Sequence, residues 1–403
     1  MRYLAGEVER LLREERKMAF VAGPRQVGKT TLARALLGEV GQGGNYFNWD
    51  VESQRRAILA RPEGFWSAAP AGRHARVALD EIHKYPRWKR FLKGLYDAAG
   101  SEAEIIATGS GRLDVYQRGG DSLFGRYGLY RLHPFTLGEI LAPDRGGVRA
   151  PGALWREAME PPPAGAGRAL ADLERFTGFP EPLFAASESR LRRWRRARRH
   201  LILREDLRDL TRIRDIGLVE TLAALLPERV GSPLSLNALS EDVGVAFGTV
   251  RTWVETLARL YYLFEIRPYA GRLARALRRE AKIYLFDYSE VADPGARFEN
   301  MVAVHLRKLV DAWNDWGLGD FELHYVRDKE KREADFLIAE SRRPFLLAEA
   351  KLSAQAPSPH LRYFHERLKP AHAALISREE PSRGPASVGG IRVLGAARFL
   401  SRL

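Results

Sequence analysis

The pattern Gly-x-x-x-x-Gly-Lys-Thr, close to the N-terminus, predicts a binding site for phosphates. It begins at Gly23 and ends at Thr30, after an apolar segment at 18–22 and before a predicted helix at 31–37. In a P-loop of this kind the glycines let backbone N–H groups surround the phosphates, and the helix N-terminus adds a partial positive charge. Lys29 would reach the β- and γ-phosphates and Thr30 would bind Mg²⁺, so the pattern predicts binding and hydrolysis of ATP with Mg²⁺. The predicted cofactor-binding residues are Gly23, Pro24, Arg25, Gln26, Val27, Gly28, Lys29, Thr30, Thr31 and Asp80.

Two acidic residues, Asp80 and Glu81, directly follow an apolar segment at 77–79. Carboxylates at the end of a buried strand cost free energy unless they have a function or a partner. Asp80 would hold Mg²⁺ through water, and Glu81 would polarise the water that attacks the γ-phosphate. The alternative is a helix N-terminus that is merely rich in acids.

Polar residues beside the next two apolar segments are candidates for contact with the γ-phosphate. The segment at 105–107 is followed by Thr108 and Ser110, either of which would sense the γ-phosphate, and a plain turn is the alternative. Arg126 precedes a segment at 129–132 and would reach a neighbouring subunit's phosphate as an arginine finger, or else serve only the fold. A finger between subunits would make the chain a homo-oligomer, with a hexamer as one candidate.

A basic segment at 190–200 contains seven arginines and no acid. A helix there would place its apolar residues on one face and its arginines over the rest. That apolar face would consist of Leu191, Trp194, Ala197 and Leu201. The formal net charge of +14 favours a polyanionic partner, and heavy use of arginine across the genome is the alternative. We predict DNA as the partner, bound through basic clusters at 190–199 and 272–279.

The segment at 235–257 shows a helix-turn-helix pattern. A capped short helix and a turn, from Ser235 to Val245, precede a helix with one apolar and one polar face. Segments 262–269 and 282–286 would pair as a wing. Between them lie Arg272, Arg275, Arg278 and Arg279. Such a winged helix would place its second helix on DNA, or would serve as a lid or a protein-docking module.

Near the C-terminus, Asp335 opens one predicted strand, and Glu349 and Lys351 share a face of the next strand. A hairpin would bring them together, and Glu299 on a predicted helix supplies another acid. This set resembles the core of PD-(D/E)xK nucleases. The resemblance implies that Asp335 and Glu349 bind Mg²⁺, that Lys351 positions or activates water, and that Glu299 assists. The alternative is a degenerate nuclease fold whose polar residues pair with one another.

A set of ordered motifs carries a second resemblance, which runs over essentially the whole chain. They lie at 23–30, 79–82, 108–110, 125–126, 132–135 and 178–181. Together they resemble the prokaryotic AAA-type ATPases that carry a C-terminal domain of unknown function similar to a PD-(D/E)xK nuclease. His83 stands where that family is expected to have Gln.

Alternating apolar and helical segments through residues 1–140 predict a parallel sheet covered by helices. With the resemblance, this gives an α/β fold class and four segments. They are an N-terminal AAA-type P-loop sheet at 1–140, a Pro/Gly-rich connector and basic helix at 141–203, a winged helix at 204–287, and an α/β restriction-endonuclease-like domain at 288–403. We expect the Pro- and Gly-rich part of the connector, 141–169, to be mobile.

The chain contains no cysteine, which excludes disulfides and thiol catalysis. It shows no signal pattern and no apolar run long enough to cross a bilayer, so we expect a cytoplasmic protein without membrane contact. Two functions remain open. One is an ATPase that remodels or translocates DNA, with metal-dependent cleavage as an added activity. The other is an ATP-dependent regulatory switch whose C-terminal domain binds protein or nucleic acid without cutting it.

Overall fold

The computed structural model describes residues 2–38, 45–62, 64–67, 74–99, 103–110, 123–142, 148–210, 215–270, 280–353, 356–381 and 386–403. The chain forms two compact units. The first comprises Met1–His133 with Pro143–Gly147, and the second comprises Pro134–Ala142 with Val148–Leu403. The predicted basic cluster at 272–279 lies outside the described residues.

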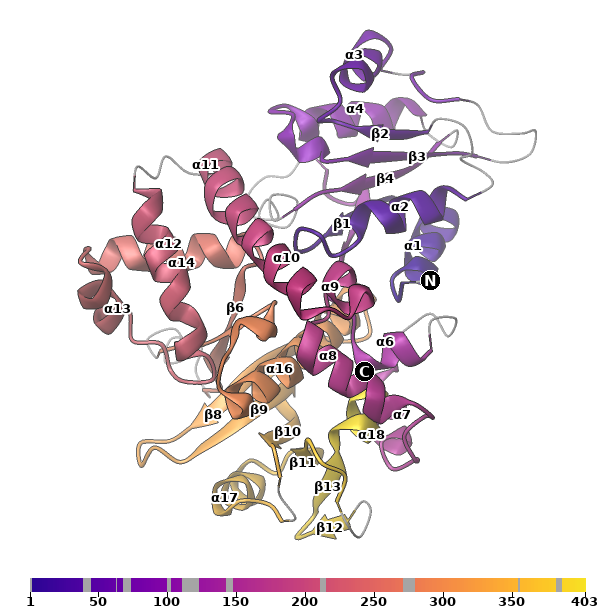
Figure 1. The fold of residues 1–403 in the computed structure, drawn as a ribbon. Coiled ribbons are helices and arrows are strands. Elements are labelled where there is room, and N and C mark those ends of the chain that lie inside the picture. Colours follow the sequence, from indigo (N-terminus) through magenta and orange to yellow (C-terminus); the bar gives the residue numbers. More distant parts are fainter. Residues whose placement is uncertain are drawn as a thin grey trace. The chain divides into compact units, whose positions relative to one another are not determined.

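The first unit contains a five-stranded, wholly parallel sheet in the order β2-β3-β4-β1-β5 (Figure 1). Its strands are β1 (Met18–Ala22), β2 (Tyr46–Asn48), β3 (Ala75–Asp80), β4 (Ala103–Thr108) and β5 (Tyr127–Arg131). The predicted parallel sheet is confirmed, although β2 was not foreseen. Because β4 lies between β1 and β3, the segments that follow these three strands meet at one edge of the sheet.

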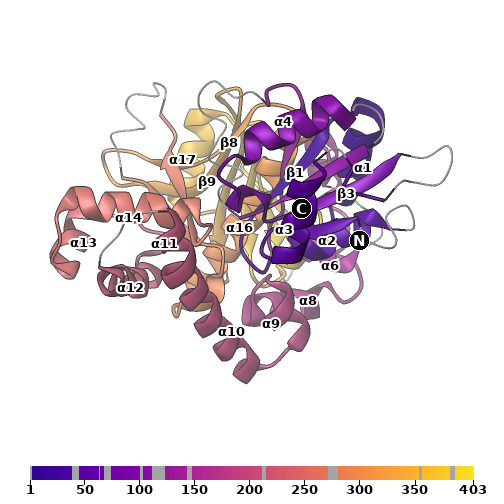
Figure 2. The ribbon, with the colours of Figure 1, turned by 90° about the horizontal axis from the view of Figure 1, so that it is seen from above.

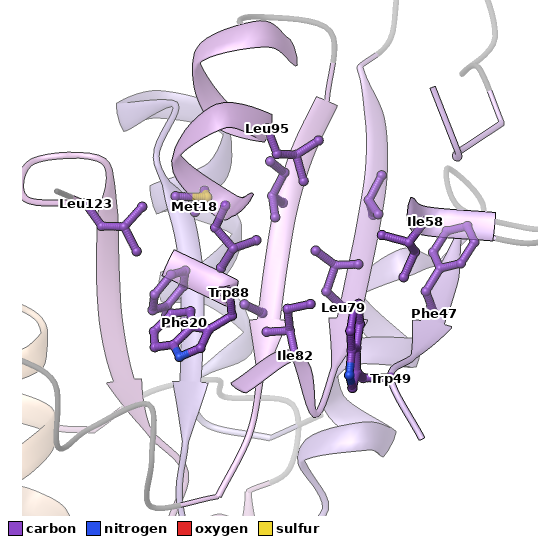
Figure 3. Packing of buried hydrophobic residues seen from close by; sticks show 14 of the residues in the cluster. Met18, Phe20, Phe47, Trp49, Ile58, Leu79, Ile82, Trp88, Leu95 and Leu123 are labelled. Carbon is purple, nitrogen blue, oxygen red and sulfur yellow. The ribbon is translucent and has the colours of Figure 1, made fainter. Parts of the chain in front are cut away.

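Helices cover both faces of this sheet, which explains why every residue of β1 and β3 is buried. They are α1 (Ala5–Arg10), η1 (Leu11–Glu15), α2 (Lys29–Leu37), α3 (Glu52–Ala60), η2 (Ile82–Lys84) and α4 (Trp88–Ala99). Side chains alternate along each strand, so Met18 and Phe20 of β1 point to the same face. There they join Ile58 of α3 and Trp88 and Leu95 of α4 in one buried cluster (Figure 3). This core holds the strand ends in place.

The second unit begins with a series of helices. They are α6 (Leu137–Leu141), α7 (Pro151–Glu157), α8 (Ala166–Phe176), α9 (Pro180–Ala185), α10 (Glu188–His200), η3 (Leu201–Asp206), α11 (Leu207–Leu210), α12 (Ile216–Leu225), η4 (Leu226–Arg229), α13 (Leu236–Val243) and α14 (Phe247–Arg259). The described residues of the segment expected to be mobile, 141–142 and 148–169, therefore contain the end of α6, all of α7 and the start of α8. Prolines at the start of α7 and α9 suit a first helical turn, where no backbone donor is needed.

Helices α12, α13 and α14 form a group that both views of the fold show together (Figures 1 and 2). Ser235 caps α13 by accepting a hydrogen bond from the Ala238 N–H at 3.3 Å, and Gly244 ends the helix in the left-handed conformation. Val250, Trp253, Val254 and Leu257 of α14 are buried. The predicted capped helix, turn and amphipathic second helix are confirmed.

An eight-stranded sheet completes the second unit, in the order β12-β13-β11-β10-β9-β8-β6-β7. Its strands are β6 (Leu263–Pro268), β7 (Lys282–Leu285), β8 (Phe321–Arg327), β9 (Glu333–Glu340), β10 (Arg343–Lys351), β11 (His372–Ser377), β12 (Ala386–Val388) and β13 (Ile391–Gly395). The accompanying helices are η5 (Tyr288–Glu290), α16 (Pro294–Asp315), α17 (Pro359–Leu368) and α18 (Ala396–Leu400). Helix α16 contacts β7 to β10, and α17 contacts β9 and β10.

The strands predicted to form a wing, β6 and β7, do pair in an antiparallel manner. However, β6 also pairs with β8, with Arg267 opposite His324. The pair therefore also forms the edge of the C-terminal sheet, a position that the sequence analysis does not predict. The winged-helix interpretation of 204–287 remains a hypothesis. Among the described residues, no helix combines the length and the apolar character needed to cross a membrane.

Candidate functional site

The P-loop connects β1 to α2 and adopts a conformation that depends on glycine. Gly23 and Gly28 have φ angles of 149° and 99°. A side chain at Gly23 would also meet the Leu132 carbonyl oxygen, which lies 2.3 Å from the position of a Cβ atom. Arg2 supports the loop, because its guanidinium donates to the Val27 carbonyl at 2.7 Å. The loop therefore leads into the N-terminus of α2, the end of a helix at which backbone N–H groups have no partner within the helix and can bind phosphates.

Lys29 and Thr30, the first two residues of α2, lie where the P-loop pattern predicts. The Lys29 ammonium donates to the carbonyl oxygens of Gly23 and Pro24 at 2.9 and 2.7 Å. The Thr30 hydroxyl donates to Asp80 Oδ2 at 2.6 Å. The two residues predicted to hold Mg²⁺ thus touch, although 50 positions separate them in the chain.

Asp80 accepts three hydroxyl hydrogen bonds, more than the sequence predicts. Besides Thr30, Tyr46 on β2 donates to Oδ2 at 2.5 Å and Thr108 on β4 donates to Oδ1. Burial alone would raise the pKa of Asp80, but the hydroxyls of Thr108, Thr30 and Tyr46 and the charge of Lys29 outweigh it and lower the pKa. Asp80 is therefore held as a carboxylate, the form that binds a cation.

Tyr46 was missed because nothing in the sequence around it indicates a site. The strand register places Asn48, two residues further along β2, opposite Asp80, and Tyr46 reaches Asp80 along the same face. Burial and the hydrogen bond to Asp80 raise the pKa of Tyr46 to about 12, so the hydroxyl stays protonated and remains a donor.

Glu81 lies beside Asp80 in an unusual backbone conformation, with a φ angle of 57°. Its N–H donates to the Thr108 carbonyl at 3.0 Å, which fixes the residue at the strand ends. Burial raises the pKa of Glu81 despite the nearby charges of Lys29 and Lys84. Its Oε2 atom is buried and has no hydrogen-bond partner among the described residues, while His83 Nε2 lies 3.6 Å away. Such a carboxylate can accept a proton from water.

Ser110 and Arg126, the remaining residues predicted for the nucleotide site, lie in different surroundings from each other. Ser110 is buried just beyond the end of β4, but Thr108, the other sensor candidate, is the one that contacts Asp80. Arg126 lies just before β5, where its Nε donates to Asp97 Oδ1 at 2.8 Å. The arginine-finger role stays a prediction.

A second cluster of charged side chains lies in the C-terminal sheet. The β9–β10 hairpin forms as predicted, and the Ala350 N–H donates to Asp335 Oδ2 at 2.9 Å. Lys351 Nζ lies 3.3 Å from Glu349 Oε1. Burial and the charge of Glu299 raise the pKa of Asp335 to about 7, although Lys282 and Lys351 oppose this. The structure therefore brings the four predicted residues into one cluster.

Three members of this cluster were not predicted, namely Lys282, Tyr284 and Glu333. The Tyr284 hydroxyl donates to Glu299 Oε1 at 2.7 Å, and Lys282 Nζ lies 2.6 Å from Glu333 Oε1. Alternation along β9 places Glu333 on the same face as Asp335, which was the available signal. Among the described residues, no group of three or more His, Asp or Glu side chains has a geometry that could hold a metal ion.

The basic helix α10 has the predicted faces only in part, because Leu191 and Trp194 of the predicted apolar face are buried but other residues differ. Ala197 is exposed, whereas Arg198 is only 1% exposed. The Arg198 guanidinium lies 4.5 Å from the ring centre of Phe179 and donates to the Tyr261 carbonyl at 3.2 Å. Arginine side chains can be buried in this way when aromatic rings and a carbonyl surround them.

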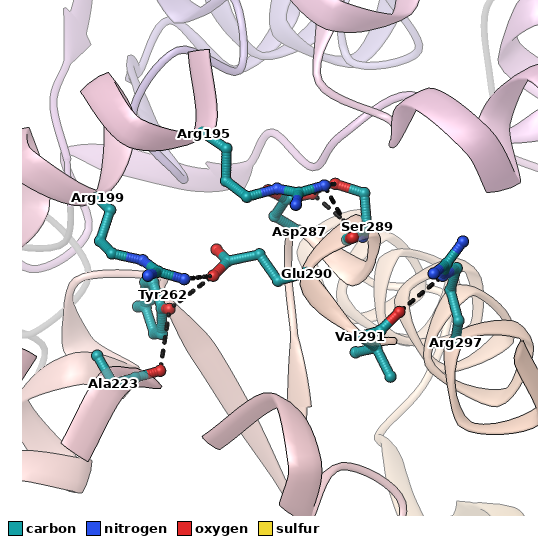
Figure 4. A network of polar contacts seen from close by, with 9 residues as sticks. All are labelled: Arg195, Arg199, Ala223, Tyr262, Asp287, Ser289, Glu290, Val291 and Arg297. Atoms are coloured by element: carbon teal, nitrogen blue, oxygen red, sulfur yellow. Dashed lines mark hydrogen bonds and ion pairs between the residues drawn. The ribbon is translucent and has the colours of Figure 1, made fainter. Parts of the chain in front are cut away.

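Two more arginines of α10 belong to an internal polar network (Figure 4). Arg195 donates to the Ser289 carbonyl at 2.8 Å, and Arg199 pairs with Glu290. Three of the arginines expected to contact DNA are therefore engaged within the unit. Arg192 and Arg196 remain exposed, and they line an open hollow of about 550 Å³ on this helix. The hollow is lined by Arg192, Arg195, Arg196, Arg199, His200, Arg204 and Glu220.

Comparison with known families agrees with the geometry of the first unit. Residues 15–141 match the model of an AAA domain. With the parallel sheet and the P-loop, this match supports a P-loop domain of the AAA class in this unit. Residues 168–291 and 294–384 match two domains of unknown function, DUF8612 and DUF4143. Neither description names an activity, so the nuclease-like character of the C-terminal segment stays a prediction.

Two relatives share most of the chain. They are uncharacterized proteins of Mycobacterium bovis and Mycobacterium tuberculosis, each 23% identical over 367 residues, which is 89% of this chain and 76% of the relative. Among solved structures, the Aeropyrum pernix ORC1 protein in complex with DNA aligns with 75% of this chain and 91% of its own, at 15% identity. Its TM-score is 0.33, which is too low to support an argument about fold or function.

Proposed function

We propose that the first unit binds ATP with Mg²⁺ and hydrolyses it. The observation that carries this proposal is the contact of 2.6 Å between Thr30 Oγ1 and Asp80 Oδ2, beside the Lys29 ammonium. Thr30 and Asp80 would hold the metal, directly and through water. Mg²⁺, when bound, neutralises the charge that develops on the phosphate oxygens.

Glu81 is the proposed base for the attacking water. The pKa of Glu81 is raised toward neutral pH, and a carboxylate with a higher pKa is a better acceptor of a proton from water. Its Oε2 atom accepts no hydrogen bond from the described residues, although His83 Nε2 and Lys84 Nζ lie 3.6 and 3.7 Å away, so a lone pair can accept a hydrogen bond from that water. Arg126 is proposed to complete the site of a neighbouring copy, which would require a homo-oligomer.

Two substitutions test the ATPase proposal. Lys29→Ala removes the phosphate-binding cation and should abolish both binding of a fluorescent ATP analogue and phosphate release. Glu81→Gln should retain binding but reduce phosphate release by about 100-fold or more. Glu14→Gln is the matched control, because this exposed acid lies in the same unit, away from the P-loop. Phosphate release by Glu81→Gln at the control rate would show that Glu81 is not the base.

We propose that the second unit binds DNA through the hollow on α10. Arg192, Arg196 and His200 are exposed there, and no ion pair of Arg192 or Arg196 is found among the described residues. Arginine contacts with phosphates release counterions, so affinity should fall steeply with salt and should not depend on base sequence.

A charge-matched pair of variants tests this surface. Arg192→Glu with Arg196→Glu should weaken DNA binding at least tenfold, because two phosphate contacts are replaced by repulsion. Arg362→Glu with Arg367→Glu makes the same change in net charge on exposed residues of α17. Equal affinities of the two variants would rule out the hollow as the contact.

The alternative function is an ATP-dependent switch without turnover on DNA. Stimulation of ATP hydrolysis by DNA separates the two. A DNA-remodelling enzyme should hydrolyse ATP faster when DNA is added, whereas a switch that regulates another molecule should not respond.

A further inference from the structure

Lys282, the first residue of β7, is buried inside the acidic cluster of the C-terminal sheet. It is 1% exposed. Its Nζ atom lies 2.6 Å from Glu333 Oε1, 3.4 Å from Glu299 Oε1 and 4.0 Å from Asp335 Oδ1. One ammonium group therefore faces three carboxylates that come from α16 and β9.

This ammonium stays charged. Burial alone would lower the pKa of Lys282, but the charges of Glu299, Asp335 and Glu333 outweigh burial and raise the pKa above its usual value. A second cation, Lys351, lies 3.3 Å from Glu349, and Arg327 lies 2.9 Å from Glu333. The acids of the cluster are thus largely neutralised by side chains of the same unit.

A divalent cation would have to share this space with Lys282. Mg²⁺ and Mn²⁺ bind carboxylate oxygens at about 2.0–2.2 Å and are repelled by an ammonium group that touches the same oxygens. Asp335 offers little to such an ion, because Oδ2 accepts the Ala350 N–H and Oδ1 faces Lys282. One feature favours a metal, namely Glu349 Oε2, which is buried without a hydrogen-bond partner among the described residues. A single free carboxylate oxygen does not make a metal site.

We propose that Lys282 is the resident cation of this cluster and excludes divalent metals, so that the C-terminal domain does not cut DNA by metal-dependent chemistry. The cluster is then a latent metal site, closed by one side chain. Removing the charge of Lys282 leaves Glu299 and Asp335 without the ammonium that both of them face, while Arg327 still pairs with Glu333, and the acids repel one another unless a metal binds.

Binding of Mn²⁺, measured by electron paramagnetic resonance without nucleotide, tests the proposal. The parent protein carries Asp80→Asn, so that the P-loop site does not contribute. Lys282→Met in this parent should bind Mn²⁺ about 100-fold more tightly than the parent does, because a repelling charge is removed from the ligands. Adding Asp335→Asn should abolish the gain. Lys282→Arg keeps the charge and should bind no better than the parent.

Two results would overturn the proposal. One is a metal-dependent property that Asp335→Asn removes. It would be either Mn²⁺ binding by the parent itself or DNA cleavage by the unmodified chain with Mg²⁺ or Mn²⁺. The other is a Lys282→Met protein with a native circular dichroism spectrum and no gain in Mn²⁺ affinity. If Lys282→Met does not fold, Lys282→Gln provides the same comparison, and the measurements on the parent and on the unmodified chain need neither variant. Because the ATPase site lies in the other unit, phosphate release is unaffected by either outcome.

Discussion

Replacing Arg199 by Met should destabilise the second unit, because it leaves Glu290 buried without its cation. The Glu290 side chain is 3% exposed and pairs with Arg199, while the Tyr262 hydroxyl donates to its Oε2 atom at 3.1 Å (Figure 4). Breaking a buried ion pair from one side costs about 3–5 kcal/mol. The Arg199 side chain is 37% exposed and the tyrosine bond remains, so about 2 kcal/mol is expected after allowance for solvent screening.

The effect should also depend on pH. Burial and the charge of Asp287 raise the pKa of Glu290 even with Arg199 present, and removal of that arginine should raise it further. A protonated Glu290 needs no cation, so the loss of stability should shrink as the pH falls.

Urea unfolding of the full chain, followed by circular dichroism at pH 8 and pH 5, measures this loss. Arg196→Met is the control, because Arg196 is exposed on the same helix and should change stability by less than about 0.5 kcal/mol. Identical unfolding midpoints for the two variants at pH 8 would refute the assignment of Arg199 to the fold. If the loss is confirmed, Arg199 must be left unchanged in any test of DNA binding.

Three further predictions concern the nucleotide site and the acidic cluster of the C-terminal sheet. Tyr46→Phe removes a hydrogen bond to the carboxylate of Asp80 and should lower kcat for phosphate release about tenfold, with little change in the affinity for an ATP analogue; an unchanged kcat would exclude a positioning role. Folding raises the pKa of Asp335 from 3.8 to about 7, so between these pH values the folded unit binds a proton that the unfolded chain does not. The stability that this proton contributes is present below pH 4 and is lost as the pH rises through 7. The unfolding free energy of the native chain, minus that of Asp335→Asn, should therefore fall between pH 4 and pH 7, and a flat difference would contradict the raised pKa. Arg126→Ala should reduce phosphate release while leaving nucleotide affinity in place, and mixing it with Lys29→Ala should restore part of the activity; no restoration at any ratio would leave the arginine finger without support.

The nucleotide site follows largely from local sequence. A P-loop needs glycine at Gly23 and Gly28, a lysine and a threonine at fixed spacing, and an apolar segment before them, and all of these lie between Met18 and Thr30. The pairing of Asp80 with Thr30 was also predictable, because parallel strands place their carboxyl ends at one edge of the sheet. The hairpin that joins Asp335 to Glu349 likewise follows from the period of two along a strand.

Other features depend on which strands become neighbours, and the sequence does not show this. Tyr46 reaches Asp80 because β2 is hydrogen-bonded to β3, and Lys282 enters the acidic cluster because β7 forms the edge of a sheet that also contains β9. Sequence periodicity assigned Arg198 to the polar face of α10, yet the rings of Phe179 and Trp194 surround it.

The sequence by itself thus determined the chemistry of groups whose partners lie along one helix, one turn or one hairpin. Only the tertiary structure decided which charges neutralise one another. The physical reason is that the pKa of a buried group and the occupancy of its site depend on every charge within a few ångströms, whatever the separation along the chain. In this protein, the nucleotide site is recognisable from its sequence motif. The acidic cluster is different, because only the tertiary structure brings Lys282 to its carboxylates.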